Sequence, residues 1–175
     1  MKNLFNKNIV YFAKMKENAK IPNKKDEDAG YDIFACFDED FIYLKQGETK
    51  LIPTGIAWAC NKKYYMQIEE RSSTGTKGIK RSAGILDSGY RGEIKIAILN
   101  STCKDLYISN LKEEELLSKY PKIKKESIIY NTEKAIAQGI IHKVEKIKVK
   151  EIPLEKLLTI PSERGNKGWG SSNKK

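Results

Sequence analysis

The sequence predicts an all-β protein, a jelly-roll-like β-sandwich or barrel with one short inserted helix and a flexible C-terminal arm. Three observations point to this fold class. Short apolar runs recur along the chain. Turn signals separate them, among them Asn23-Lys24-Lys25, Gln46-Gly47 and Asn61-Lys62-Lys63. One segment has the boundaries of a helix, and 175 residues are enough for a single domain with a substantial core.

The strands are expected where apolar residues alternate or cluster between these turns. Ile94, Ile96 and Ile98 repeat with the period of two that a half-buried strand requires. The expected strands are Val10–Phe12, Tyr31–Phe37, Phe41–Leu44, Lys50–Ala59, Tyr64–Glu69, Gly92–Leu99, Ala135–Ile141 and Lys146–Ile152.

The stretch from Gly84 to Glu93 is expected to be a β-hairpin that presents one acid and one aromatic. Ile85-Leu86 leads in, and Ser88-Gly89 supplies the turn. Asp87 and Tyr90 would then lie at the tip, either as part of a site or as an ordinary surface turn.

Residues 101–131 are expected to be an inserted helical segment. Asn110 can cap a first turn with Glu113 in a capping box, and Pro121 would end the helix. Such an insertion is either solvated or a contact for a regulatory protein.

The last residues are expected to form an arm, which divides the chain into a β domain over 1–160 and a flexible segment over 161–175. Arg164-Gly165 could wrap a phosphate chain, and Trp169 has nothing local to pack against. Both features fit a lid that closes over a nucleotide.

Composition excludes several classes of protein. The single histidine, His142, argues against a multi-histidine metal centre, and the three cysteines have no metal-ligand spacing, which favours reduced thiols. No apolar run suits a membrane span or a secretory signal, so we expect a cytoplasmic protein and no membrane partner. The net charge of +10 favours an anionic ligand, but without a recognisable motif we do not expect nucleic acid to be a partner.

Five short motifs, in order, resemble those of the trimeric dUTP pyrophosphatases, or dUTPases, and span about Asp28 to Ser172. The second motif opens with Arg71-Ser72-Ser73, at the start of the loop Arg71–Gly78. The hydroxyls of this loop suit phosphate oxygens, although the loop is not a Walker A sequence. The motifs are Ala29-Gly30-Tyr31-Asp32-Ile33-Phe34-Ala35, Arg71-Ser72-Ser73, Gly84 to Glu93 with Asn100, Ile136-Ala137-Gln138, and Arg164-Gly165-Asn166-Lys167-Gly168-Trp169-Gly170-Ser171-Ser172. The insertion before the fourth motif is similar to that of some phage-encoded members.

The resemblance implies a homotrimer whose three active sites combine segments of all three chains, with Mg²⁺ as cofactor and dUTP as substrate. Asp87 would activate a water that attacks the α-phosphorus, releasing dUMP and pyrophosphate. Asp32 would contact the Mg²⁺ shell only through water.

The resemblance also assigns substrate-binding roles. Tyr90 would lie against the deoxyribose, and the backbone from Gly84 to Leu86 would pair with uracil. Trp169 would stack on the base. The residues that would hold the α- and β-phosphates are Arg71, Ser72, Ser73 and Gln138. From the arm, Arg164 would clamp the γ-phosphate, and Gly170 and Ser171 would also bind the substrate.

This sequence departs from the family pattern at several positions. Glu70 stands where a proline is common, Glu133-Lys134-Ala135 replaces a Gly-Asp-Arg sequence, and Gly139 stands where leucine is usual. A dCTP deaminase with the same fold is an alternative, but its catalytic glutamate aligns with Ala97, which cannot move a proton. A regulatory protein-binding role through 101–131 is the other alternative.

Overall fold

The chain divides into two compact units, residues 1–144 and 145–175. The computed structural model describes residues 8–167 of them. None of the helices in this range has the length and apolar content needed to cross a membrane. The boundary that the sequence predicts, after residue 160, lies inside the second of these two units.

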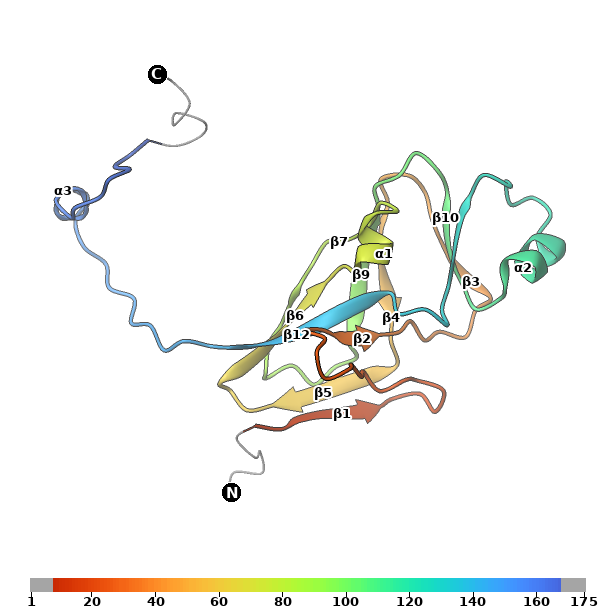
Figure 1. Ribbon diagram of the computed structural model, residues 1–175, viewed down its shortest axis with the longest axis horizontal. Coiled ribbons are helices and arrows are strands. Elements are labelled where there is room, and N and C mark those ends of the chain that lie inside the picture. Colours follow the sequence, from red (N-terminus) through yellow and green to blue (C-terminus); the bar gives the residue numbers. More distant parts are fainter. Residues whose placement is uncertain (1–7, 168–175) are drawn as a thin grey trace. The chain divides into compact units, whose positions relative to one another are not determined.

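The first unit is built almost entirely from strands (Figure 1). Its strands are β1 (Val10–Lys14), β2 (Tyr31–Ile33), β3 (Phe41–Leu44), β4 (Thr49–Pro53), β5 (Ile56–Cys60), β6 (Tyr64–Glu69), β7 (Ile79–Arg81), β8 (Ile85–Leu86), β9 (Lys95–Asn100), β10 (Leu106–Ser109), β11 (Ile128–Asn131) and β12 (Ala137–Lys143). Two short helices, α1 (Ser72–Gly75) and α2 (Glu113–Lys119), interrupt them, and α3 (Leu154–Leu158) lies in the second unit.

The strands of the described residues form four small sheets. Their orders are β1-β5, β11-β10-β3, β2-β12-β6-β8 and β4-β9-β7. The core lies between them and contains Ile33, Trp58, Met66, Ile96 and Leu106, each at most 2% exposed. The alternation predicted around Ile96 is therefore a true core pattern.

The expected strand Lys50–Ala59 is two strands joined by a corner. β4 pairs with β9, whereas β5 pairs with β1, so the chain changes sheet at Thr54-Gly55. Gly55 adopts a φ of 65°, and its N–H donates to Glu93 at 2.9 Å. The Thr54 hydroxyl donates to the Ile94 carbonyl at 2.5 Å. The uninterrupted β-favouring sequence concealed a turn that glycine makes possible.

The predicted hairpin between Ile85-Leu86 and the strand after Glu93 is wrong as a pairing. β8 pairs antiparallel with β6, and β9 pairs with β4 and β7. The turn itself is present, because the Tyr90 N–H donates to the Asp87 carbonyl at 3.1 Å. Asp87 and Tyr90 therefore lie on a connection between two sheets.

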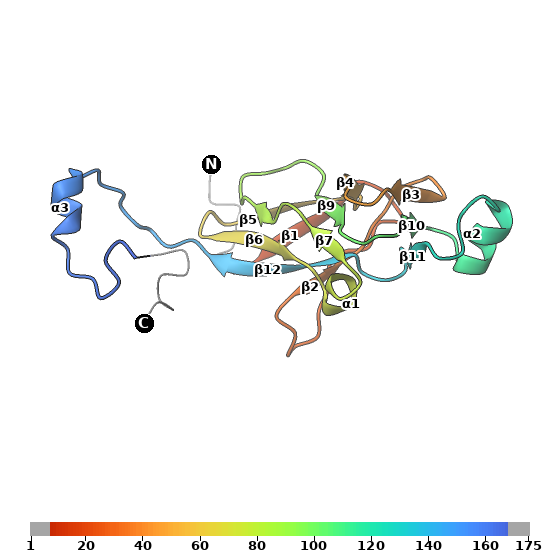
Figure 2. The same cartoon turned by 90° about the horizontal axis from the view of Figure 1, so that it is seen from above.

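Residues 101–131 contain the expected helix as α2, but the expectation of a helical excursion misses the two strands that flank it. Strand β10 pairs antiparallel with β3 and parallel with β11, and α2 is the crossover between the two parallel strands. Both views place α2 at this end of the unit (Figures 1 and 2). The segment supplies two strands of a sheet, with Leu106 and Ile108 fully buried.

The helix α2 begins after Lys112, and Asn110 is not its N-cap. Asn110 instead donates to the carbonyls of Phe37 and Glu39 at 3.0 and 2.7 Å, which ties the segment to the loop before β3. The predicted end at Pro121 is confirmed, since the helical residues stop at Lys119.

The expected strand Lys146–Ile152 is not formed, and residues 144–153 have no regular secondary structure. Its apolar side chains are among the most exposed of the described chain, with Ile147 at 80% and Val149 at 97%. The pattern of a strand is present, but residues 145–167, the described part of the second unit, contain no strand with which it could pair.

Candidate functional site

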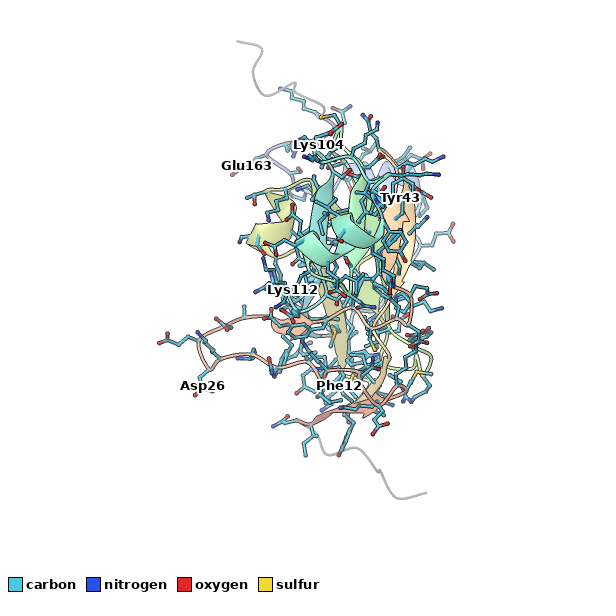
Figure 3. All side chains as sticks on the ribbon, turned by 90° about the vertical axis from the view of Figure 1, so that its right-hand side faces the viewer. Phe12, Asp26, Tyr43, Lys104, Lys112 and Glu163 are labelled. Carbon is cyan, nitrogen blue, oxygen red and sulfur yellow. The ribbon has the colours of Figure 1, made fainter. Side chains whose placement is uncertain are left out.

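A polar pocket of about 380 Å³ collects residues from three of the five sequence motifs. It is lined by Asp28, Ala29, Gly30, Asp32, Arg71, Ser72, Ser73 and Gln138. The loop before β2 contributes one wall, and Figure 3 shows Asp26 of that loop projecting from the body of the unit. The structure therefore brings together Asp32, Arg71, Ser72, Ser73 and Gln138.

Strand pairing explains the convergence. Gln138 on β12 lies opposite Asp32 on β2 and opposite Glu69 at the end of β6. Arg71 follows that end of β6 after one residue. Three positions that are far apart in sequence thus meet at one end of three neighbouring strands, β2, β12 and β6.

Arg71 is held on two sides. Its Nε lies 3.0 Å from the Asp32 carboxylate, and its Nη1 donates to the Ala135 carbonyl at 3.4 Å. The buried Thr74 fixes the turn that follows, because its hydroxyl donates to the Arg71 carbonyl at 2.9 Å and accepts from the Arg71 N–H at 3.1 Å. Ser72 and Ser73 are left exposed at the pocket.

Gln138 fits the pocket wall only because residue 30 is a glycine. A Cβ at Gly30 would lie 2.7 Å from the Gln138 Oε1 and 3.0 Å from its Cβ. The Gln138 Nε2 donates to the Glu70 carbonyl at 2.9 Å, so the backbone before Arg71 orients the amide.

Sequence reasoning missed Tyr130 of β11 behind this pocket. The phenol is 3% exposed and donates to the Ala135 carbonyl at 2.6 Å, the same carbonyl that Arg71 contacts. Burial raises the pKa of Tyr130, while the charge of Arg71 and hydrogen bonds with Arg71 and Ser73 lower it. The sequence carried no signal for this contact, because the acceptor is a backbone carbonyl that any residue at position 135 would offer.

Asp87 and Tyr90 stand together on the turn after β8. Asp87 is exposed, and Tyr90 is 45% exposed with its hydroxyl donating to the Glu93 carbonyl at 3.0 Å. A Cβ at Gly92 would lie 2.5 Å from the Tyr90 hydroxyl, so glycine lets the ring fold over this turn.

This turn does not line the pocket, and the register shows why. Leu86 pairs with Met66, and β8 runs antiparallel to β6, so each further residue moves away from Glu69 and the pocket. Asp87 continues to the level of Tyr65, which is about 13 Å along β6 from Glu69 at about 3.3 Å per residue. The strands β2 and β8 are also opposite edges of the sheet. Within one chain, Asp87 and Asp32 therefore lie far apart.

Gly84 and Leu86 are fixed by β6 and by an ion pair. The Ile68 N–H donates to the Gly84 carbonyl at 2.7 Å. Beside Gly84, the Arg81 guanidinium binds both carboxylate oxygens of Glu69 at 2.9 to 3.2 Å. Hydrogen bonds from Gln67 and Arg81 lower the pKa of Glu69. The motif analysis had not singled out this pair.

Arg164 lies in the second unit, where its Nε donates to the Lys167 carbonyl at 2.8 Å and its side chain is exposed. Trp169, Gly170 and Ser171 lie outside the described residues. His142 lies on β12, and its ring stacks on that of Tyr65 with the centroids 5.3 Å apart.

Comparisons with known proteins identify the family of the chain. The dUTPase family profile matches residues 17–112. A deoxyuridine 5'-triphosphate nucleotidohydrolase of Leptospira interrogans is 38% identical over 95 residues, covering 52% of this chain and 65% of that protein. The enzyme of the same name from Rickettsia bellii is 32% identical over 166 residues, which cover 93% of this chain and 89% of the relative.

A solved structure shares the fold as well. The Staphylococcus bacteriophage 80alpha dUTPase with dUpNHpp superposes with a TM-score of 0.69 at 25% identity, over 94% of this chain and 98% of that one. The predicted jelly-roll-like β-sandwich is confirmed. On the extent of these matches, the chain belongs to the dUTPase family.

Proposed function

We propose that this protein hydrolyses dUTP to dUMP and pyrophosphate. The pocket carries the proposal, because it gathers the Arg71 guanidinium, two serine hydroxyls and the Gln138 amide in one concave surface. A guanidinium with hydroxyl and amide donors is a set of groups suited to phosphate oxygens. Family membership supplies the nucleotide class.

In this proposal the pocket binds the α- and β-phosphates. Asp32 and the Ala135 carbonyl hold Arg71 in place, so the ligand does not have to order the side chain on binding. Arg164 from the arm would clamp the γ-phosphate, and Trp169, Gly170 and Ser171 would close over the nucleotide.

The turn after β8 would supply the chemistry and the base recognition. Asp87 would take a proton from the water that attacks the α-phosphorus, and its exposure leaves room for that water. Tyr90 would lie under the deoxyribose and exclude a 2′-hydroxyl. The backbone of Gly84 to Leu86 would select uracil, because the exocyclic donor of cytosine would meet another donor.

We propose a homotrimer, because one chain does not bring Asp87 to the pocket. A second copy could present its Asp87 turn to the pocket of the first. The exposed apolar residues Ile147, Val149 and Leu154 in the second unit also call for a partner surface, and another copy of the chain is the simplest source.

The residues present fit Mg²⁺ as an ion carried by the substrate. In the described part of the chain, no group of three or more His, Cys, Asp or Glu residues could form a protein cage for a metal. Asp32 is already paired with Arg71, which suits a contact through water. Mg²⁺ keeps several waters and binds substrate phosphates readily, and its charge would offset theirs.

The alternatives have less support. Ala97 is buried on β9, so the position of the deaminase glutamate carries no acid. A regulatory partner could reach only the exposed face of the 101–131 segment, since β10 and β11 are core strands. For the compartment we propose the cytoplasm, because Cys36 and Cys60 are buried free thiols.

The test is to mix the protein with dUTP, dCTP, dTTP or UTP in the presence of Mg²⁺ and to measure pyrophosphate and ammonia. Pyrophosphate should be released from dUTP alone. Ammonia released from dCTP would favour the deaminase, and equal hydrolysis of UTP would contradict the role of Tyr90.

A further inference from the structure

Tyr130 lies near the end of the 101–131 segment, on β11, yet its hydroxyl contacts the Ala135 carbonyl, which Arg71 of the pocket also contacts. Its Cα pairs with Ile108 in the parallel ladder, which anchors it in the core. The hydroxyl meets the Ala135 carbonyl two residues before Ala137, where β12 begins.

This hydroxyl shares a hydrogen-bond acceptor with Arg71. Its proton goes to the Ala135 carbonyl at 2.6 Å. Burial raises the pKa of the phenol, and the charge of Arg71 lowers it. Arg71 itself reaches the same Ala135 carbonyl at the longer distance of 3.4 Å.

A phenylalanine would fill the same space without forming these contacts. The Ala135 carbonyl would lose its shorter hydrogen bond, so the acceptor that Arg71 also uses would be held less firmly. Removing one member of a buried polar network releases the orientation of the others. The hydroxyl is therefore suited to orienting charged groups rather than to filling volume.

We infer that Tyr130 is a positioning residue for phosphate binding, acting on Arg71 through the Ala135 carbonyl that both side chains contact. The inference rests on the proposed function, in which Arg71 binds the substrate phosphates. It gives the 101–131 segment a part in the site, because the segment carries the strand that holds the phenol.

The test is Tyr130→Phe, assayed with dUTP and with two ligands that differ in their phosphates. We expect KM for dUTP to rise about tenfold, which corresponds to about 1.4 kcal/mol. Binding of a non-hydrolysable dUTP analogue should weaken by the same factor. Binding of deoxyuridine, which has no phosphate, should not change, and kcat should change far less than KM.

Tyr43→Phe is the matched control. It removes a phenol that donates to Asp105 at 2.9 Å in the same three-stranded sheet, outside the pocket. Figure 3 labels Tyr43 on the upper right of the unit. This variant should keep the KM of the unaltered protein.

An Arg71→Lys background separates positioning from a general effect on structure. There the further change Tyr130→Phe should leave KM unaltered, since the guanidinium that the phenol orients is gone. Thermal denaturation of each variant checks folding. If Tyr130→Phe proves unfolded, ¹³C-labelled tyrosine rings in the unaltered protein replace the variant. The signal of the buried Tyr130 should then shift with the dUTP analogue and not with deoxyuridine.

An unchanged KM in folded Tyr130→Phe, equal weakening of deoxyuridine binding, or an unshifted Tyr130 signal would overturn the inference. Failure of the unaltered protein to cleave dUTP would instead overturn the proposed function. The inference is thus tested by comparing Tyr130→Phe with the unaltered protein, whereas the proposed function is tested on the unaltered protein alone.

Discussion

Asp32 and Asp87 are both aspartates of family motifs, but their surroundings give them different capacities. Asp32 is paired at 3.0 Å with Arg71, so its negative charge is committed to holding a cation. Asp87 is exposed on a turn, with its backbone carbonyl and not its carboxylate engaged in the turn hydrogen bond. Of the two, Asp87 is therefore the candidate base.

Asp87→Asn should lower kcat for dUTP by about a hundredfold to ten-thousandfold, the range expected when a general base is removed. Binding of a non-hydrolysable dUTP analogue should stay near that of the unaltered protein, because the phosphate pocket is untouched. Pyrophosphate release and calorimetric titration measure the two quantities. Asp38→Asn, at an exposed aspartate paired with Lys16, is the control and should retain full activity. Full turnover by Asp87→Asn would remove the residue from the mechanism.

The second prediction at the scale of residues concerns the ion pair between Arg81 and Glu69. Their side chains are 28% and 24% exposed, and the contact is bidentate. Arg81→Met should lower the free energy of unfolding at pH 7 by about 1 to 3 kcal/mol, the range for hydrogen bonds to charged groups. Denaturant unfolding measures this loss.

The effect should depend on pH with a defined sign. Because the pKa of Glu69 is lowered in the folded protein, its stabilisation is complete above the unfolded value of about 4.3 and is lost as the pH falls through the lower folded value. The unaltered protein and Arg81→Met should therefore converge in stability in strongly acidic buffer. Lys16→Met, which breaks the exposed pair with Asp38, should show no measurable change at either pH. A constant difference for Arg81→Met across this pH range would contradict the assignment.

At the scale of elements, α2 is a packed crossover and not a solvated excursion. Leu116 is fully buried, and Tyr120 donates to Asp40 at 2.6 Å. Phe41 of β3 makes edge contacts with the rings of Tyr107 and Tyr120 at 5.2 and 5.1 Å. The helix is thus attached to the sheet by apolar, aromatic and polar contacts together.

Leu116→Ala should therefore cost about 2 to 5 kcal/mol of unfolding free energy, as for a buried leucine in a core. The neighbouring Leu117, only half-buried, is the matched control, and Leu117→Ala should cost clearly less. Chemical denaturation of both variants gives the comparison. Equal, small losses would favour a solvated insertion instead.

At the scale of the whole molecule, the separation of the pocket from the turn that carries Asp87 leads to a prediction about trimers assembled from two different variants. Asp87→Asn and Arg71→Ala chains should each be inactive. When they are unfolded together and refolded, mixed trimers should regain activity, because some sites combine an intact turn from one chain with an intact pocket from the other. Pyrophosphate release from dUTP measures the recovery.

The control mixes Asp87→Asn with Tyr90→Ala, two changes on the same turn. No site in that mixture can have an intact turn, so no activity above that of the separate variants should return. Light scattering should give three times the 20.0 kDa chain mass for the unaltered protein. A monomer with full activity would contradict the shared site.

Removal of metal is the last prediction at this scale. EDTA should abolish pyrophosphate release, and excess Mg²⁺ should restore it, because the positive charge near the phosphates comes from the ion as well as from Arg71. Thermal stability without nucleotide should not change, since the described residues hold no metal cage. Full turnover in EDTA would contradict the proposed cofactor.

The sequence by itself predicted that the chain is mostly strands, that alternating isoleucines lie in the core, and that five motifs occur in order. These features could be predicted because alternation along a strand and the residues of a short motif are local properties of the chain. The sequence did not determine that β8 joins β6, that residues 101–131 supply two strands of a sheet, or that Tyr130 and Arg71 share the Ala135 carbonyl, since each depends on pairing between distant segments. Register decided the rest: β12 between β2 and β6 made the pocket, and the antiparallel run of β8 carried Asp87 away from it.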